Sequence, residues 1–328
     1  MERISLSNRS FEGNNNAYLF ADGPETVLVD TGDRLPGTRE QLEAELGEHG
    51  TSMADIDRVL LTHWHGDHRG LAGAIQAESG ATVHVHSADA PLVAGDPDAW
   101  EAMSDRQEQY FEQWGMPEPK RELLRGVLDS VAWRENPPTV HSFEDGETFA
   151  VNGRRLTAVH APGHTAGLCM FRTTEEGEDV VLAGDALLPK YTPNVGGADI
   201  RVERPLEQYL DTLRSTAAAA YDRAWPGHRD PIDDPTARAE FITDHHEERA
   251  WRVLDALRRH GPADAWTVSA DLFGDLEHIH ILHGPGEACA HLSHLEREGT
   301  VRREGTEYSL ADGVGAKLDD RENQRWPL

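Results

Sequence analysis

Three histidines and one aspartate fall within six residues, in the pattern His-x-His-x-Asp-His that runs from His63 to His68. They follow the largely apolar run 58–61, which predicts a buried strand that ends at this loop. His63 and His65 are two apart and would point to the same side of an extended chain. A tight turn at the next glycine would bring Asp67 and His68 close to them. Such nitrogen and oxygen ligands suit a pair of divalent metal ions, and a solvated surface loop is the alternative.

Three later segments repeat the pattern of an apolar strand that ends in a turn with a potential ligand. The turns carry His164 after Pro-Gly, Asp185 after Gly, and His228 after Pro-Gly. Loops at the strand ends of a rigid scaffold often carry binding and catalytic residues. Each turn is ordinary by itself, but four of them in one chain favour a common metal centre.

This ordered set of motifs resembles the metallo-β-lactamase fold superfamily of metal-dependent hydrolases. The resemblance covers roughly residues 1–240 and includes Val-Leu-Val-Asp-Thr-Gly at 27–32, which in the family is a strand and turn beneath the site. It implies an α+β fold, a four-layer αβ/βα sandwich. Two β-sheets would pack together with helices on both outer faces and the metals at one edge.

The resemblance also implies two metal sites that share one carboxylate. One metal would be held by three histidines: His63, His65 and His164. The other would be held by Asp67, His68 and His228. Asp185 would bridge the two metals. Because no thiolate is among these ligands, Zn²⁺, Mn²⁺ and Fe²⁺ would all fit. Zn²⁺ is the leading expectation.

Two metal ions about 3.5–4 Å apart can share a hydroxide formed from bound water. This bridging hydroxide would attack an electrophilic carbonyl or phosphoryl centre. Asp67 is expected to orient the nucleophile and take its proton, because its second oxygen stays free.

The carboxylate at Asp185 bears on the substrate, since β-lactamases that resemble this fold generally carry cysteine there. The pattern is closer to thioesterases and esterases, so a glyoxalase II-like thioester or ester hydrolase is the leading expectation. A phosphodiesterase or endoribonuclease of the same fold is the runner-up. A mononuclear iron persulfide dioxygenase and a nucleic-acid-binding regulator are further alternatives.

The elements expected around these turns form a catalytic domain over residues 1–240. A helical insertion at about 88–142 would contain helices over 98–114 and 121–131. These two helices either pack on the sheet or form a lid over the metals.

A glycine-rich loop at 194–201 lies between the last two ligand-bearing turns and is followed by a predicted helix over 206–221. This loop should therefore border the site. Lys190, Tyr191 and Arg201 are candidate substrate contacts on that basis.

Residues 241–312 form a smaller predicted domain. A long helix over 236–259 leads to further helices and an alternating hairpin around Gly305. This arrangement resembles the winged-helix domain of two-domain lactamase-like hydrolases. Five histidines there lack the carboxylate or cysteine spacing of a metal site: His278, His280, His283, His291 and His294. The tail at 313–328 is polar and expected to be ordered only in part.

The charge of the smaller domain bears on its partners. Residues 241–312 contain seven arginines and fourteen acidic residues, whereas phosphate binding needs a positive footprint. Nucleic acid is therefore not favoured as a partner. Packing, homodimerisation or gating of a small-molecule substrate is preferred.

The composition of the whole chain is strongly acidic. The formal net charge is −28 over 328 residues, and lysine occurs only at Lys120, Lys190 and Lys317. An acidic, lysine-poor surface is typical of salt-accumulating halophiles, where molar salt screens the repulsion. Intrinsic disorder or a cationic partner are the alternatives.

Cellular location is indicated by the two cysteines and by the apolar segments. Cys169 and Cys289 lie in different predicted domains, so a disulfide is not expected. No apolar signal core and no stretch of transmembrane length is found. The expectation is a cytoplasmic protein with no membrane partner.

Overall fold

The computed structural model describes residues 1–8, 13–130, 136–319 and 324–328. The chain forms two compact units. The first unit consists of Met1–Trp100, Trp133–Pro193 and Ser215–Ala239. The second consists of Glu101–Ala132, Asn194–Arg214 and Glu240–Leu328. The two units do meet at the expected boundary, between residues 239 and 240. However, residues 101–132 and 194–214, which precede that boundary, also belong to the second unit.

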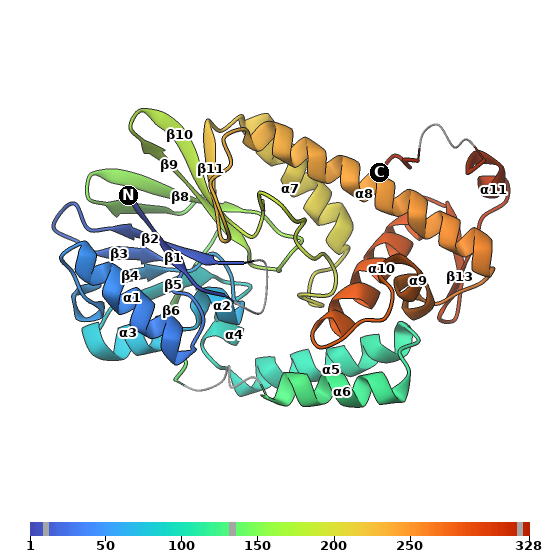
Figure 1. The fold of residues 1–328 in the computed structure, drawn as a ribbon, viewed down its shortest axis with the longest axis horizontal. Helices are drawn as coiled ribbons and strands as arrows, with labels where there is room; N and C mark the ends of the chain where they lie inside the picture. The colour runs from blue at the N-terminus through green and yellow to red at the C-terminus, as the bar shows by residue number, and fades with distance from the viewer. Residues whose placement is uncertain (9–12, 131–135, 320–323) are drawn as a thin grey trace. The chain divides into compact units, whose positions relative to one another are not determined.

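The first unit contains a six-stranded sheet whose strands follow chain order (Figure 1). Its strands are β1 (Glu2–Leu6), β2 (Asn15–Phe20), β3 (Val27–Val29), β4 (Arg58–Leu60), β5 (Thr82–His86) and β6 (Val140–Phe143). The pairs β1–β2 and β2–β3 are antiparallel, and β3 to β6 run parallel. All of β3 is buried, as expected for a parallel strand covered on both faces.

A five-stranded sheet completes the sandwich of the first unit, in the order β11-β10-β9-β8-β7. Its strands are β7 (Thr148–Val151), β8 (Arg154–His160), β9 (Cys169–Glu175), β10 (Glu178–Gly184) and β11 (Arg223–Pro226). Only β10 and β11 pair in parallel among these neighbours. The carboxyl ends of β10 and β11 therefore lie at the same edge of the sheet.

The two sheets share one apolar core. Phe143 from β6, Phe149 from β7 and Phe171 from β9 have ring centroids 5.4–6.2 Å apart. Full burial of an aromatic side chain of this size is favourable by about 1.5–3 kcal/mol. Leu60 at the end of β4 and Leu182 in β10 belong to the same core. Strands that lead to candidate ligands are thus anchored in it.

Helices α1 (Pro36–Glu48) and α3 (Ala72–Ser79) lie against the six-stranded sheet, near β1 and β5 respectively (Figure 1). Three short helices lie next to strands of that sheet in the chain: η1 (Met53–Asp55) before β4, α2 (Gly66–Arg69) after β4, and α4 (Ala90–Val93) after β5. The α+β sandwich predicted from the sequence is confirmed.

The second unit is mainly helical. Its elements include α6 (Glu118–Ser130), α9 (Ala265–Phe273), α10 (His280–Arg297), β12 (Val301–Glu304), β13 (Glu307–Leu310) and α11 (Val314–Lys317). Three helices contribute residues to both units: α5 (Pro97–Gln113), α7 (Pro205–Ala219) and α8 (Pro235–His260). The predicted hairpin is confirmed, with β12 and β13 antiparallel. Assignment of these elements to the winged-helix class stays a prediction.

Two expectations fall partly on residues outside the described ranges. These are the last residue of the predicted helix 121–131 and residues 320–323 of the tail. Among the helices in the described ranges, none is both long and apolar enough to cross a membrane.

Candidate metal centre

Every candidate metal ligand lies just past the end of a strand in the first unit. His63 and His65 follow β4, while Asp67 and His68 lie in the short helix α2. The other three follow β8, β10 and β11 in that order: His164, Asp185 and His228. The structure thus brings together all seven residues that the sequence nominated, from four separate turns.

Three histidine nitrogens converge on one point. His63 Nε2 lies 3.0 Å from His65 Nδ1, and His164 Nε2 lies 3.1 Å from the same atom. One ligand atom from each of these residues lies within 4.8 Å of the others. Three imidazoles at such spacing match the three-histidine sites that hold zinc.

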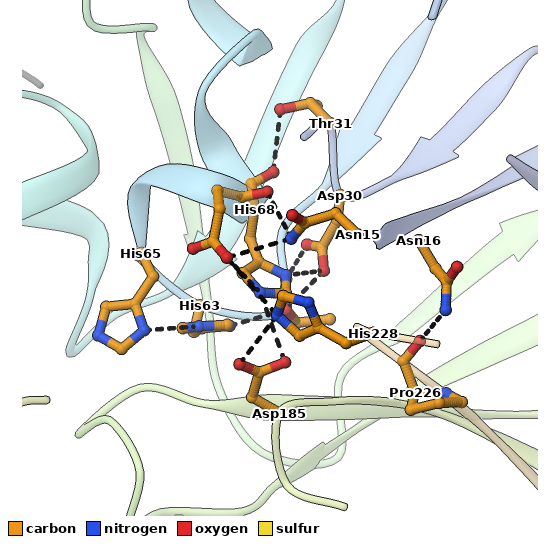
Figure 2. A network of polar contacts seen from close by, with 12 residues as sticks. Asn15, Asn16, Asp30, Thr31, His63, His65, His68, Asp185, Pro226 and His228 are labelled. Atoms are coloured by element: carbon orange, nitrogen blue, oxygen red, sulfur yellow. Dashed lines mark hydrogen bonds and ion pairs between the residues drawn. The ribbon is translucent and has the colours of Figure 1, made fainter. Parts of the chain in front are cut away.

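A second set lies beside the first (Figure 2). Asp67 Oδ2 is 3.5 Å from His228 Nε2 and 3.9 Å from His68 Nε2. These three residues form another group whose ligand atoms lie within 4.8 Å of one another. This set could supply the nitrogen and oxygen donors of a second site.

Asp185 faces both sets. Its Oδ2 lies 3.6 Å from His164 Nε2 and 3.5 Å from His228 Nε2, and its Oδ1 lies 3.4 Å from His68 Nε2. Figure 2 shows its carboxylate directed at the histidine cluster. A carboxylate so placed has the geometry of a shared ligand.

Two buried polar atoms of the cluster lie 3.4 Å apart and yet form no hydrogen bond with each other or with another described residue. His68 Nε2 and Asp185 Oδ1 make no hydrogen bond to any residue that the structure describes, although both are shielded from solvent. Buried polar groups are normally paired, so an unpaired one needs an explanation. Divalent cations would satisfy both atoms, and the mixed nitrogen and oxygen donor set fits such ions.

The pKa values of these side chains determine which of them are ready to bind a metal ion. Burial, with His68 and His65 nearby, lowers the pKa of His63 well below its usual value. Burial would raise the pKa of Asp185, but His228 and His68 outweigh it and hold that pKa well below its usual value. His63 is therefore neutral and Asp185 ionised at neutral pH, which are the protonation states that bind metal. Burial would lower the pKa of His68 and of His228, but Asp185 and Asp67 outweigh it and raise both, so these two imidazoles would release a proton on binding metal.

Asp30 holds the His68 ring in place through its Nδ1 atom, a role that the sequence analysis did not find. This buried carboxylate lies 2.8 Å from His68 Nδ1 through Oδ2, and it accepts hydrogen bonds from the amide and hydroxyl of Thr62, each at 2.8 Å. Such a carboxylate fixes the ring orientation and would keep the proton on Nδ1 when a metal ion binds Nε2. The Val-Leu-Val-Asp-Thr-Gly motif was the signal for Asp30, but it indicated only a strand and turn.

Substitution of Asp30 by asparagine should therefore weaken metal binding without removing a ligand. Loss of a residue that hydrogen-bonds a metal ligand typically costs 10–100-fold in metal affinity or activity, and we expect a loss of about this size in zinc affinity. Competition with a chromophoric chelator measures it. The control is Asp22→Asn, because Asp22 pairs with Arg154 at the surface. Equal affinities in the two variants would show that Asp30 does not support the site.

Glycine 227 lets the backbone approach the ligands closely. Its amide donates to the carbonyl oxygen of Gly184 at 2.7 Å, which links the turns that carry Asp185 and His228. A Cβ at position 227 would lie 2.5 Å from Asp185 Oδ1 and 2.6 Å from His68 Cε1. The glycine of the Pro-Gly-His turn thus leaves room for two candidate ligands.

The three candidate substrate contacts are divided between the units. Lys190 and Tyr191 belong to the first, where Tyr191 is 46% exposed. Arg201 belongs to the second, where its Nε donates to buried Asp199 at 2.9 Å. The Lys190 ammonium lies 5.2 Å from the centroid of the Tyr191 ring, and the guanidinium carbon of Arg229 lies 5.0 Å from it. Arg229 was missed by the sequence analysis, and its only signal is its position next to His228.

The histidines of the smaller predicted domain do not join the centre. Within the described ranges, each group of three or more residues that could hold a metal is drawn from the same seven side chains. His291 instead lies 3.3 Å from His246 in the second unit, measured between ring nitrogens.

Comparison with known proteins matches residues 11–228 to the model of the metallo-beta-lactamase superfamily. A solved metallo-beta-lactamase family protein of Thermus thermophilus is 33% identical, with a TM-score of 0.80 over 94% of this chain and 98% of that one. A beta-lactamase domain protein of Burkholderia ambifaria has the same fold, at 22% identity and a TM-score of 0.76 over 94% of this chain and 92% of that one.

Curated relatives match the chain at lower identity than the Thermus thermophilus protein does. A beta-lactamase-like protein 2 homolog of Caenorhabditis elegans is 24% identical over 94% of this chain and 88% of the relative. A lactamase-like protein of Penicillium aethiopicum is 27% identical over 74% of this chain. The chain spans only 60% of the length of that fungal relative. Since the family model covers well over half of the chain and its motifs form the metal centre, this protein belongs to the metallo-beta-lactamase superfamily.

Proposed function

We propose that this protein is a glyoxalase II-like hydrolase that cleaves a thioester or ester with two divalent metal ions. Zn²⁺ is the leading candidate for these ions. The observation that carries the proposal is the position of Asp185, whose carboxylate faces both histidine sets at 3.4–3.6 Å. A carboxylate that faces two ligand sets could bind two metal ions that act together. The absence of cysteine from the ligand set argues against a β-lactamase.

The chemistry supplied by two bound divalent ions is a water molecule with a pKa lowered toward neutrality and a polarised substrate carbonyl. Asp67 would orient the attacking water. Its Oδ2 accepts hydrogen bonds from the side-chain amides of Asn15 at 3.2 Å and Asn8 at 3.3 Å. Its Oδ1 has no hydrogen-bond partner among the described residues, so it remains available to accept a proton from water.

A panel of substrates tests this function. Purified protein in molar salt would be assayed on S-acyl thioesters, an aryl ester, a bis-aryl phosphodiester and single-stranded RNA, each with and without chelator. We expect chelator-sensitive thioester or ester cleavage. If only RNA or the phosphodiester is cleaved, the proposal is wrong and the protein is a nuclease or phosphodiesterase. A single bound iron with sulfur oxidation would replace it with an oxygenase, and metal-loaded protein without turnover would favour a regulator.

We further propose that Lys190, Tyr191 and Arg229 contact an anionic group of the substrate. Neither Lys190 nor Arg229 has a carboxylate partner among the described residues, although the chain carries a net charge of −28. Substitution of Lys190 by glutamine should raise KM for a thioester that carries a carboxylate and leave KM for its methyl ester unchanged. Steady-state kinetics checks this, with Lys317→Gln as the control, since Lys317 lies over Trp326 in the second unit. Equal changes for both substrates would exclude charge recognition.

We also propose that the protein acts in the cytoplasm of a salt-accumulating cell. Both cysteines are free, and the acidic charge is spread along the chain. Since the Debye length falls from about 10 Å at 0.1 M to about 3 Å at 1 M salt, the unfolding temperature should rise steeply with KCl. Thermal unfolding by circular dichroism measures the rise. Sucrose at matched osmolality controls for the exclusion of solute from the protein surface. An unfolding temperature that falls as KCl is added would contradict the proposal.

A further inference from the structure

Asp89 is a fully buried carboxylate of the first unit that is absent from the candidate ligand set. The residue is 0% exposed. Its Oδ2 accepts hydrogen bonds from the amide of Trp64 and the hydroxyl of Thr165, each at 3.1 Å. Its Oδ1 accepts a hydrogen bond from the amide of Gly167, also at 3.1 Å. Burial of an ionised carboxylate is costly unless it is hydrogen-bonded, and these three donors offset that cost.

The donors come from two turns that carry ligands of the same set. Trp64 lies between His63 and His65, and Thr165 directly follows His164. Asp89 therefore joins two turns that are a hundred residues apart in the chain. Two of these hydrogen bonds are donated by backbone amides, so Asp89 restrains the main chain beside the ligands.

The fit around Asp89 is close. A Cβ at Gly167 would lie 2.6 Å from Asp89 Cγ and 2.8 Å from Asp89 Oδ1. The same two turns are also joined by the Cys169 amide, which donates to the carbonyl oxygen of Thr62 at 2.9 Å. Asp89 therefore occupies a space shaped for it, and its loss would leave backbone donors unpaired inside the protein.

We propose that Asp89 is a positioning residue that fixes the spacing of His63, His65 and His164, and thereby sets the affinity of this triplet for a divalent cation. The inference rests on the two-metal site of the proposed function and is independent of the substrate. Asp30 supports the other triplet through His68. Loss of Asp89 should therefore weaken one cation site much more than the other.

The test uses the full chain with Asp89→Ala and Asp89→Asn, and measures two zinc dissociation constants by chelator competition. In the alanine variant, we expect one constant to rise by about 10–100-fold, the range for residues that support metal ligands, while the other changes little. The asparagine variant should be intermediate, because its NH₂ group must face at least one backbone donor. The matched control is Asp145→Ala, since exposed Asp145 accepts a backbone hydrogen bond from His160 at 2.8 Å.

Hydrogen exchange of the zinc-free protein gives a second measurement. Peptides that cover 62–68 and 162–168 should exchange faster in the Asp89 variants than in Asp145→Ala. Unchanged zinc constants, or equal weakening of both zinc sites, would overturn the proposal. If the alanine variant does not fold, the asparagine variant decides the outcome. If the wild-type chain binds no divalent cation, the proposed function fails, while exchange in the two peptides still tests how Asp89 holds the turns.

Discussion

Replacement of Asp185 by alanine is expected to remove most of the bound metal and to abolish hydrolysis. Its two oxygens lie 3.4–3.6 Å from nitrogens of His68, His164 and His228, so the change removes ligand atoms from both sites at once. We expect the affinity to fall by more than the 10–100-fold that loss of a residue supporting a ligand typically costs. Metal analysis of the dialysed protein beside turnover measures both effects.

Two further variants separate charge from shape. Asp185→Asn keeps the size of the side chain but removes the charge, and it should lose nearly as much metal as the alanine variant. Asp179→Ala removes a carboxylate of the same strand that pairs with Arg172 at 2.9 Å, and it should keep its metal. Two metals per chain in Asp185→Ala would show that Asp185 is not a shared ligand.

The ligand-bearing turns could be predicted from the sequence because their signals are local. The strands before His63 and Asp185 are short apolar runs that end in a polar turn, and the structure places β4 and β10 there. The long helix predicted over 236–259 is observed as Pro235–His260. Apolar periodicity and turn residues suffice for such elements, because each is set by neighbours in the chain.

The residues that support the ligands could not be predicted in this way. Asp30 contacts His68 across 38 positions of the chain, and Asp89 contacts Gly167 across 78. These contacts exist only after the strands have paired. In the sequence, Asp89 stands in Ser-Ala-Asp-Ala, which reads as an ordinary polar turn. The same limit applies to the grouping of 101–132 with the second unit, because compact units are defined by contacts between distant segments.

Substitution of Asp67 by asparagine is expected to lower kcat by about 10²–10⁴-fold, the usual contribution of general acid–base catalysis. Burial would raise the pKa of Asp67, but His68 and His228 outweigh it and hold that pKa below its usual value. The carboxylate is therefore ionised at neutral pH and can orient a water molecule as an acceptor. Asparagine has the same shape, but its NH₂ group cannot accept a proton.

The effect on metal content distinguishes Asp67 from Asp185. Asp67 pairs with histidines of the second set, with Oδ2 3.5 Å from His228 Nε2 and 3.9 Å from His68 Nε2, and the amides of Asn15 and Asn8 hold that oxygen in place. We therefore expect Asp67→Asn to retain more metal than Asp185→Ala while its kcat falls far below the wild-type value. Metal analysis and kcat for both variants at one salt concentration check this, with the surface variant Asp179→Ala as the common control. If Asp67→Asn loses metal and activity in the same proportion, Asp67 acts only as a ligand, and another group must orient the water.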